Sequence, residues 1–216
     1  MSLQPKHNCS NCPRLFKFRE ENRIKFPDKF NAPVPSFGSN DAELLIVGLA
    51  PGLKGANFTG RPFTGDFAGD FLYDALRKQS LTEGQYKRHG DDNIKLLNCR
   101  ITNAVRCVPP QNKPTGDEIL ECNDFLRKEI SSLPNLRIII SLGTISHNAV
   151  LKSFKLKQSA YKFGHGHQHK ITLEHLDNPI ALLDSYHCSR YNTNTGRITE
   201  DMFQNILISA KSILNN

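Results

Sequence analysis

Four short apolar runs, each followed by a segment with helical spacing, constrain the fold of this chain more than any other feature. The apolar runs cover residues 44–47, 98–105, 137–141 and 180–185. Apolar residues recur at helical intervals near 70–79, 115–132, 145–154 and 200–214. Strands that alternate with helices favour a parallel sheet in an α/β fold. The length of 216 residues suits one domain, so we expect residues 1–216 to form a single unit.

Residues 1–40 do not continue this alternation. They are rich in proline and in charged residues. Such a composition is typical of a segment without a regular core-facing pattern. We therefore expect residues 1–40 to form an irregular arm on the surface.

Three of the four predicted strands run into polar loops. These loops read "GLAPG" after residue 47, "NAVRCVPP" from residue 103 and "DSYHCSRYN" from residue 184. In doubly wound sheets, ligands bind in the crevice beyond the carboxyl ends of the strands. The functional site is therefore expected where these loops meet.

The first of these loops is rich in glycine, as the stretch "LLIVGLAPGLKGANFTGRPFTGD" at residues 44–66 illustrates. It lacks the G-x-x-x-x-G-K-[ST] order of a phosphate-binding loop and the G-x-G-x-x-G spacing of a dinucleotide-binding turn. It does place Phe63 between Pro62 and Thr64, with Asp66 close behind. A ring that can stack and a carboxylate that can position water favour a planar base over a phosphate as the ligand.

The charge of the chain points to the same class of partner. The formal net charge is +7, which favours a polyanion such as nucleic acid. No apolar run approaches the roughly 20 residues of a membrane-spanning helix. The start "MSLQPKHNCSNC" also lacks the apolar core of a secretion signal. We therefore expect a cytoplasmic protein whose six cysteines stay reduced.

Four of the cysteines have the arrangement of a metal site. Cys9 and Cys12 form a C-x-x-C pair, Cys107 follows a predicted strand, and Cys122 lies in the next predicted helix. Four thiolates could meet if the arm packs beside that loop, and either zinc or a four-iron, four-sulfur cluster accepts such ligands. Cys99 instead lies inside an apolar strand, which is typical of a buried thiol.

The histidines allow more than one interpretation. His165, His167 and His169 alternate, so on a strand they would face one way and could bind a metal. A hairpin without metal is the favoured alternative, because no carboxylate or cysteine accompanies them at ligand spacing. His187 ends a predicted strand at the crevice, where an imidazole can donate to a developing anion. A nucleophilic Cys188 beside it is disfavoured, because neighbouring residues on an extended chain point apart.

Five motifs, in order, then resemble one known family. They are "CSNCPRL", "GLAPGLKGANFTGRPFTGD", "ITNAVRCVPPQNKP", "FGHGHQH" and "SYHCSRYNTNTGRIT". Together they closely resemble the iron-sulfur uracil-DNA glycosylases of the subfamily called type b or family five. The resemblance covers nearly the whole chain. It implies a three-layer α/β/α sandwich with a short central parallel sheet, uracil excision from DNA, and a 4Fe-4S cluster on Cys9, Cys12, Cys107 and Cys122 that ties down the arm.

The resemblance also implies roles for individual residues. Related enzymes carry a polar residue where this chain has Ala50, so Asp66 is expected to orient the attacking water, with the Ala50 turn assisting. Asn103 is expected to read the edge of the uracil through its amide. His187 would donate to the departing base, and Phe63 would stack on it once it is extruded. Excision of deaminated purines such as hypoxanthine and xanthine would fit a wide pocket of this family.

Other loop residues are expected to bind the base or the DNA. The expected substrate-binding residues are Gly48, Ala50, Pro51, Gly52, Phe63, Asn112, Arg190 and Tyr191. Arg190 and Tyr191 would fill the space that the extruded base leaves. Further contacts with the DNA backbone are expected from Lys54, Asn57, Arg61, Asn112, Lys113, Thr195, Gly196 and Arg197.

These inferences predict a monofunctional hydrolase. Enzymes that also cut the DNA backbone use a lysine nucleophile, and no lysine in these motifs is placed for that role. We expect a monomer that acts on uracil-containing DNA, and the sequence identifies no protein partner such as a sliding clamp. Two alternatives remain open, namely a nucleoside hydrolase and a non-catalytic metal-cluster protein that binds nucleic acid.

Overall fold

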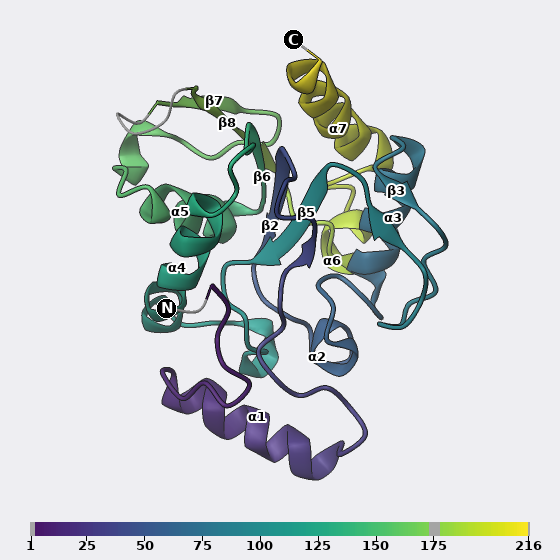
Figure 1. Cartoon of the computed structure of the whole chain (residues 1–216), viewed down its shortest axis with the longest axis vertical. Coiled ribbons are helices and arrows are strands. Elements are labelled where there is room, and N and C mark those ends of the chain that lie inside the picture. The colour runs from purple at the N-terminus through teal and green to yellow at the C-terminus, as the bar shows by residue number, and fades with distance from the viewer. Residues whose placement is uncertain (1–2, 173–177, 216) are drawn as a thin grey trace.

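The computed structural model describes residues 3–172 and 178–215, and a mixed β-sheet forms its centre (Figure 1). Within these residues the sheet has six strands in the order β1-β5-β2-β6-β8-β7. They are β1 (Phe37–Gly38), β2 (Leu44–Gly48), β5 (Cys99–Asn103), β6 (Ile138–Leu142), β7 (Gln168–Ile171) and β8 (Ile180–Ser185). The inner strands are parallel, and β1 and β7 pair antiparallel at the edges. The four predicted strands are confirmed as the inner strands, and the two edge strands were missed.

The inner strands are buried on both faces, which explains their sequences. Every residue of β2, β5 and β6 is buried. A parallel sheet with both faces covered needs continuous apolar runs and not an alternating pattern. Along β2, Leu44 and Ile46 enter one core and Leu45 and Val47 enter the other, because successive side chains point to opposite faces.

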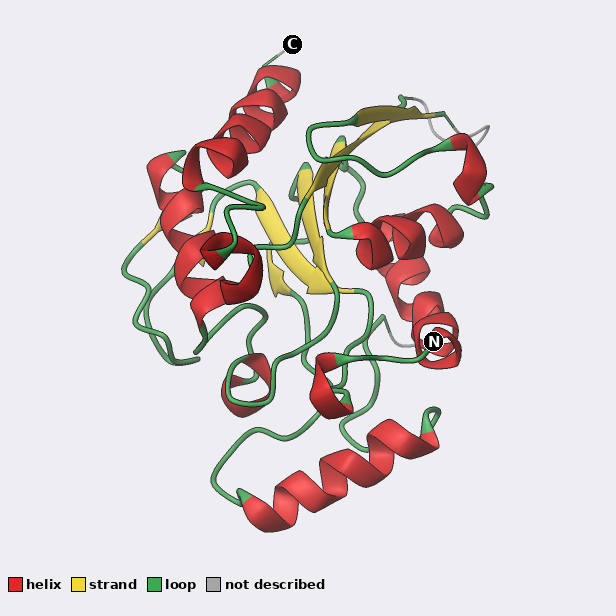
Figure 2. Cartoon of the chain, turned by 180° about the vertical axis from the view of Figure 1, so that it is seen from behind, coloured by secondary structure: helices red, strands yellow, loops and turns green. Residues whose placement is uncertain are grey.

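Two helix layers provide these cores. The first core is covered by α3 (Phe67–Lys78) and α7 (Glu200–Leu214), and the second by α4 (Gly116–Ser131) and α5 (Thr144–Ser153). Figure 2 shows the two groups of helices on either side of the strands. The predicted three-layer α/β/α sandwich around a short, mostly parallel sheet is therefore confirmed.

Side-chain caps fix the starts of α3 and α4, among other helices. Thr115 and Glu118 form a reciprocal capping box at the start of α4. Asp66 caps α3 by accepting the backbone N–H of Gly69 at 3.1 Å. This cap starts α3 at Phe67, three residues before the predicted start near residue 70. The cap also fixes the carboxylate that the sequence marks as functional.

The amino-terminal segment is more regular than its sequence indicates. Residues 13–25 form helix α1 (Pro13–Lys25), so the prediction of an irregular arm is wrong for this part. Pro13 lies in the first turn, where proline is tolerated. In α1 only Leu15, Arg19 and Asn22 are buried, so the helix lacks the continuous apolar stripe by which helices are recognised in a sequence. In both views, α1 lies on the side of the molecule toward which the carboxyl ends of the parallel inner strands point (Figures 1 and 2).

Short elements complete the described part of the chain. They are α2 (Ala56–Thr59), β3 (Thr82–Glu83), β4 (Lys95–Leu96), η1 (Pro110–Asn112), η2 (Gln158–Ala160) and α6 (Arg190–Asn194). Strands β3 and β4 pair with each other outside the main sheet. Among the described residues, no helix has the length and apolar character required to cross a bilayer.

Candidate active site

Three loops meet at the carboxyl ends of the parallel strands. Gly48 at the end of β2 lies opposite Asn103 at the end of β5. Pairing continues beyond both strands, because the Ala104 N–H donates to the Gly48 carbonyl at 2.9 Å and the Val105 N–H donates to the Leu49 carbonyl at 2.9 Å. The loop after β2 therefore runs beside the loop after β5 at the predicted crevice.

Gly48 allows two functional side chains to come together. A Cβ atom at Gly48 would lie 2.4 Å from Asn103 Oδ1 and 2.5 Å from the Phe63 ring. Contacts this short do not occur at real Cβ atoms, so a larger residue would displace the amide or the ring. The absence of a side chain at Gly48 thus sets the distance between Asn103 and Phe63.

Phe63 is held in a strained position against His187. Its backbone φ angle is +50°, a value that residues other than glycine rarely adopt. Only 7% of the residue is exposed. Its ring stacks on the His187 ring with a centroid separation of 5.9 Å and an interplanar angle of 29°. The predicted stacking residue and the predicted donor therefore lie side by side, at the position predicted for the crevice.

His187 is a neutral group at physiological pH. Burial lowers its pKa to about 4, because the desolvated site disfavours the charged form. Asn192 fixes the backbone by donating from Nδ2 to the His187 carbonyl at 2.8 Å. Within the described residues, neither ring nitrogen of His187 makes a hydrogen bond. One N–H of a neutral imidazole is thus available to a ligand.

Asn103 has a polar atom that lacks a partner. The residue is 3% exposed, and its Oδ1 is buried without a hydrogen bond to any described residue. An unpaired buried acceptor costs about 1–3 kcal/mol, so such groups are rare away from functional sites. The amide is therefore suited to accept from a ligand N–H, as the predicted reading of a base edge requires.

The two carboxylate oxygens of Asp66 face different neighbours. Oδ1 accepts the capping hydrogen bond of α3. Oδ2 faces the loop after β2, since a Cβ at Gly52 or Gly55 would lie 2.9 Å or 2.2 Å from it. Gly52 and Gly55 thus allow Asp66 to approach the "GLAPG" turn closely. The joint action of Asp66 and this turn stays a prediction.

Cys188 is unsuited to act as a nucleophile. It is fully buried, and its Sγ lies 3.6 Å from the Ala68 carbonyl oxygen. Burial, together with the nearby charge of Asp66, raises the pKa of its thiol to about 12. The thiol therefore stays protonated and unreactive.

The remaining predicted substrate residues lie around this centre. Pro51 is buried in the turn after β2, and Asn112 is exposed at the end of η1. On α6, Tyr191 is 73% exposed and Arg190 lies over the Phe67 ring at 5.3 Å. The exposed Tyr191 ring is accessible to a ligand, as insertion into DNA would require.

Two predicted contacts with the DNA backbone are wrong. Asn57 is fully buried and donates to Asn31 Oδ1 at 2.8 Å. Arg61 is 6% exposed and forms an ion pair with Asp92. Both side chains are directed into the protein, so neither can reach a phosphate.

The four predicted metal ligands line one small cavity below the "GLAPG" turn. Cys9, Cys12, Cys107 and Cys122 share this cavity with apolar side chains such as Leu15. Ala50 packs against the same apolar group. The cysteine cavity therefore lies directly behind the turn that carries the first predicted substrate residues.

Hydrogen bonds and charge surround these thiols. Arg19 donates from Nη1 to Cys107 Sγ at 3.2 Å and from Nη2 to the Cys9 carbonyl at 2.6 Å. The Arg106 N–H donates to Cys122 Sγ at 3.4 Å. Burial raises the pKa of Cys12 and of Cys107 to about 12, so the free thiols are protonated. Donors aimed at sulfur favour the thiolate form that a metal requires.

The alternating histidines make different contacts. His165 accepts the Tyr186 N–H at 3.2 Å, and His167 Nδ1 contacts the Lys162 carbonyl at 3.1 Å. Only His169 lies in β7. The disfavoured alternative, in which all three histidines lie on one strand, is therefore wrong.

His169 instead joins a buried group that the sequence did not reveal. Asp184 accepts from His147 Nδ1 at 2.7 Å and from His169 Nε2 at 3.1 Å. Ser141 and the Gly164 N–H also donate to Asp184, at 2.8 Å and 3.3 Å. These residues come from distant parts of the chain, so no local spacing in the sequence predicts that Asp184 contacts His169.

The geometry around His147 requires a doubly protonated ring. Nδ1 faces the Asp184 carboxylate, and Nε2 faces the Tyr161 carbonyl at 2.8 Å. Both partners are acceptors, so both nitrogens must donate. Burial opposes the charge, but the hydrogen bond and charge of Asp184 outweigh it and raise the pKa of His147 above its usual value.

The positive charge on the His147 ring predicts that the folded state loses stability as the pH rises. The folded pKa of His147 lies above the unfolded value, so its contribution is present below about pH 6.5 and is lost as the pH passes the folded pKa. We expect the slope of the thermal midpoint between pH 6 and pH 9 to become flatter in His147→Gln. An unchanged slope in that variant would assign the pH dependence to other groups.

Comparison with known proteins gives consistent matches. A family model described as the uracil DNA glycosylase superfamily matches residues 35–211. A type-5 uracil-DNA glycosylase of Thermus thermophilus is 42% identical over 95% of this chain and 93% of its own length. Relatives of the same description from Mycobacterium bovis and Pyrobaculum aerophilum are 38% and 35% identical, over 95% and 93% of this chain and 78% and 86% of their own lengths.

Proposed function

Because this chain belongs to the uracil DNA glycosylase superfamily, we propose that it is a hydrolase that excises uracil from DNA and so initiates base excision repair. The observation that carries the proposal is the group around Gly48, where an unpaired Asn103 oxygen, a free His187 donor and the Phe63 ring meet. These are the donor, acceptor and stacking surface that a uracil ring needs.

The reaction replaces one bond to the sugar by another. The bond between C1′ and the base breaks and its electron pair leaves with uracil. A water oxygen bonds to C1′, and the proton that this water releases balances the one that the uracil anion takes up. The sugar becomes positive and the base negative in the transition state, as in other glycosyl transfers. Groups aimed at these charges therefore accelerate the step.

The residues of the crevice match these charges. His187 donates a hydrogen bond to the uracil oxygen on which negative charge builds. Asn103 accepts from the uracil N–H and so orients the ring. Asp66 holds the attacking water beside the Ala50 turn and stabilises the positive sugar. Phe63 stacks on the extruded base, and Arg190 and Tyr191 occupy the space left in the DNA.

Incubation with a uracil-containing oligonucleotide, followed by alkali, tests the proposal. Alkali should cleave the strand at the uracil position and leave a control strand with thymine intact. Cleavage before alkali would reveal lyase activity and contradict a monofunctional enzyme. Turnover of free deoxyuridine, or DNA binding without excision, would favour a nucleoside hydrolase or a non-catalytic binding protein. Strands with hypoxanthine or xanthine test the proposed wider base range.

We propose that the four cysteines hold a 4Fe-4S cluster and not zinc, as the resemblance to the iron-sulfur enzymes implies. In a tetrahedral zinc site with Zn–S bonds of 2.3 Å, sulfur atoms lie about 3.8 Å apart. Among the described residues, no three of the cysteine sulfurs lie within 4.8 Å of one another, whereas His147, His169 and Asp184 do. The sulfur atoms are therefore not gathered as closely as a tetrahedral zinc site requires. When bound, the cluster would join α1, the loop after β5 and α4 through Cys9, Cys12, Cys107 and Cys122 as a structural link.

Replacing a cluster ligand should remove the cluster. We expect purified wild-type protein to be brown and Cys107→Ser to be colourless with a lower thermal midpoint, because ligation contributes to folding. Cys99→Ser is the matched control, since Cys99 is fully buried in β5 but lies outside the cavity. A colourless, zinc-containing wild type with full activity would contradict the assignment.

Replacing Phe63 should weaken capture of the base. Stacking is worth about 1–3 kcal/mol per base. We therefore expect Phe63→Ala to lower kcat/KM for uracil excision by the factor that corresponds to this free energy. The affinity for undamaged duplex should barely change, because no base is extruded there. An equal loss in both measurements would place Phe63 in the core or in the DNA backbone contact.

A further inference from the structure

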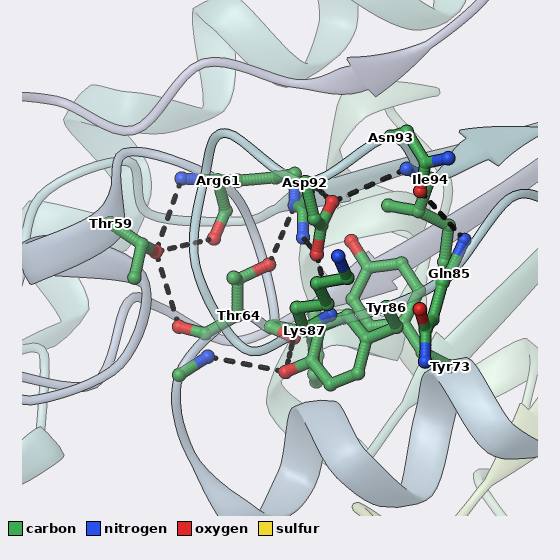
Figure 3. A network of polar contacts seen from close by, with 12 residues as sticks. Thr59, Arg61, Thr64, Tyr73, Gln85, Tyr86, Lys87, Asp92, Asn93 and Ile94 are labelled. Atoms are coloured by element: carbon green, nitrogen blue, oxygen red, sulfur yellow. Dashed lines mark hydrogen bonds and ion pairs between the residues drawn. The ribbon is translucent and has the colours of Figure 1, made fainter.

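A buried ion pair lies directly behind the segment that carries Phe63 and Asp66. Arg61 Nη1 and Nη2 contact the two carboxylate oxygens of Asp92 at 2.5 Å and 2.9 Å (Figure 3). The side chains are 7% and 0% exposed. Arg61 also donates from Nε to Thr64 Oγ1 at 2.9 Å. One guanidinium thus joins the residues after Pro62 to the segment between β3 and β4.

Aromatic rings enclose this guanidinium. Its central carbon lies 5.1 Å from the centroid of Phe37, 5.5 Å from that of Tyr73 and 5.8 Å from that of Tyr86. The Tyr73 and Tyr86 rings stack on each other at 4.4 Å. Planar stacking and a two-pronged contact with carboxylate are properties of arginine that lysine lacks.

The two tyrosines hold the backbone on both sides of Phe63. Tyr73 donates from its hydroxyl to the Pro62 carbonyl at 3.1 Å, and the Gly65 N–H donates to the Tyr86 hydroxyl at 3.2 Å. The positive φ of Phe63 lies between these two anchors. Such a backbone conformation costs about 1–3 kcal/mol and persists only where its surroundings enforce it.

Asp92 is itself fixed by its own loop. Its carboxylate accepts the Lys87 N–H at 2.7 Å and the Ile94 N–H at 3.3 Å. Burial opposes ionisation, but the Arg61 hydrogen bond and these backbone donors outweigh it and hold the pKa of Asp92 below its usual range. Both members of the ion pair are thus charged, and Asp92 is held by hydrogen bonds from Arg61 and from its own loop.

We propose that Arg61, Asp92, Tyr73 and Tyr86 form a clamp that positions Phe63 and Asp66 for base excision. A buried ion pair is not in itself favourable, because removing two charges from water offsets their attraction. The clamp therefore acts on geometry, by enforcing the strained segment that presents the stacking ring and the carboxylate. This role rests on the proposed function, while the rigidity of the segment can be measured without it.

Arg61→Lys tests the clamp, with Arg100→Lys as its matched control. Arg100 forms a similarly buried pair with Glu129, at 2.8 Å and with exposures of 11% and 1%, but it lies near the start of β5, away from the crevice. We expect Arg61→Lys to slow single-turnover excision by roughly 10- to 100-fold, since small displacements of reacting groups have effects of this size. Arg100→Lys should keep the wild-type rate at a comparable thermal midpoint.

Amide hydrogen exchange provides a readout that does not depend on activity. Peptides covering residues 61–70 should exchange faster in Arg61→Lys than in Arg100→Lys. If Arg61→Lys fails to fold, Tyr86→Phe serves instead, because it keeps the stacked ring and removes only the hydroxyl, which accepts the Gly65 N–H at 3.2 Å and donates to the Phe63 carbonyl at 3.5 Å. Wild-type exchange and rate in a folded Arg61→Lys or Tyr86→Phe would overturn the clamp. Absence of uracil excision by the wild type would reject the proposed function and leave the exchange test standing.

Discussion

Replacing His187 by alanine is expected to slow single-turnover excision of uracil by roughly 100- to 1,000-fold, the usual cost of removing one donor aimed at a developing anion. The His187 ring stacks against Phe63, and its two nitrogens make no hydrogen bond to another described residue, so the ring N–H is available to the ligand. The affinity for undamaged DNA should change little, because the donor acts only on an extruded base.

The pH dependence gives a second test of His187. Burial lowers its pKa to about 4, so the ring is neutral throughout the range in which the enzyme would be assayed. The difference between wild type and His187→Ala should therefore be constant from about pH 5.5 to pH 8. A rate advantage of the wild type that disappears as the pH rises through about 6.5 would indicate a charged donor with an ordinary pKa and contradict the neutral imidazole.

The frame of the fold could be predicted because its signals are local. The apolar runs at residues 44–47 and 137–141 are inner strands, since a sheet covered on both faces requires such runs. Helix α1 was missed for the opposite reason. Its buried face holds Arg19 and Asn22 beside Leu15, because it faces the cysteine cavity and polar loops and not the main core.

The candidate site was predictable only in part. The motifs indicated Phe63, Asn103 and His187, but their meeting depends on the register that sets Gly48 opposite Asn103. No spacing in one sequence encodes that register. The roles of these residues rest on the resemblance and stay predictions until the variants are measured.

Arg61 illustrates the limit most clearly. In the sequence it is a cation in a crevice loop and resembles a phosphate contact. In the structure Asp92 neutralises it, although Asp92 comes from "HGDDN", which has the composition of a solvated turn. The pairing is a long-range contact, so composition and local pattern cannot distinguish a structural cation from a DNA-binding one.

Replacing Asp66 should slow excision in a way that differs from the loss of His187. Asp66→Asn removes the charge but keeps an oxygen that can cap α3, so a loss of roughly 100-fold or more would come from chemistry and not from the helix start. Asp66→Ala should show the same rate loss and, in addition, a stability loss of about 1 kcal/mol. Thr199→Ala, which removes the cap of α7, controls for that stability loss and should keep the wild-type rate.

An activated base separates the two groups. With 5-fluorouracil the departing base carries its charge more readily, so the deficit of His187→Ala should shrink. The deficit of Asp66→Asn should persist, because the water and the positive sugar need their partner whichever base departs. Equal recovery of both variants on the activated base would refute this division of labour. A fully active Asp66→Asn would transfer water positioning to the backbone around Ala50 or to Asn103, since these groups lie nearest the same turn.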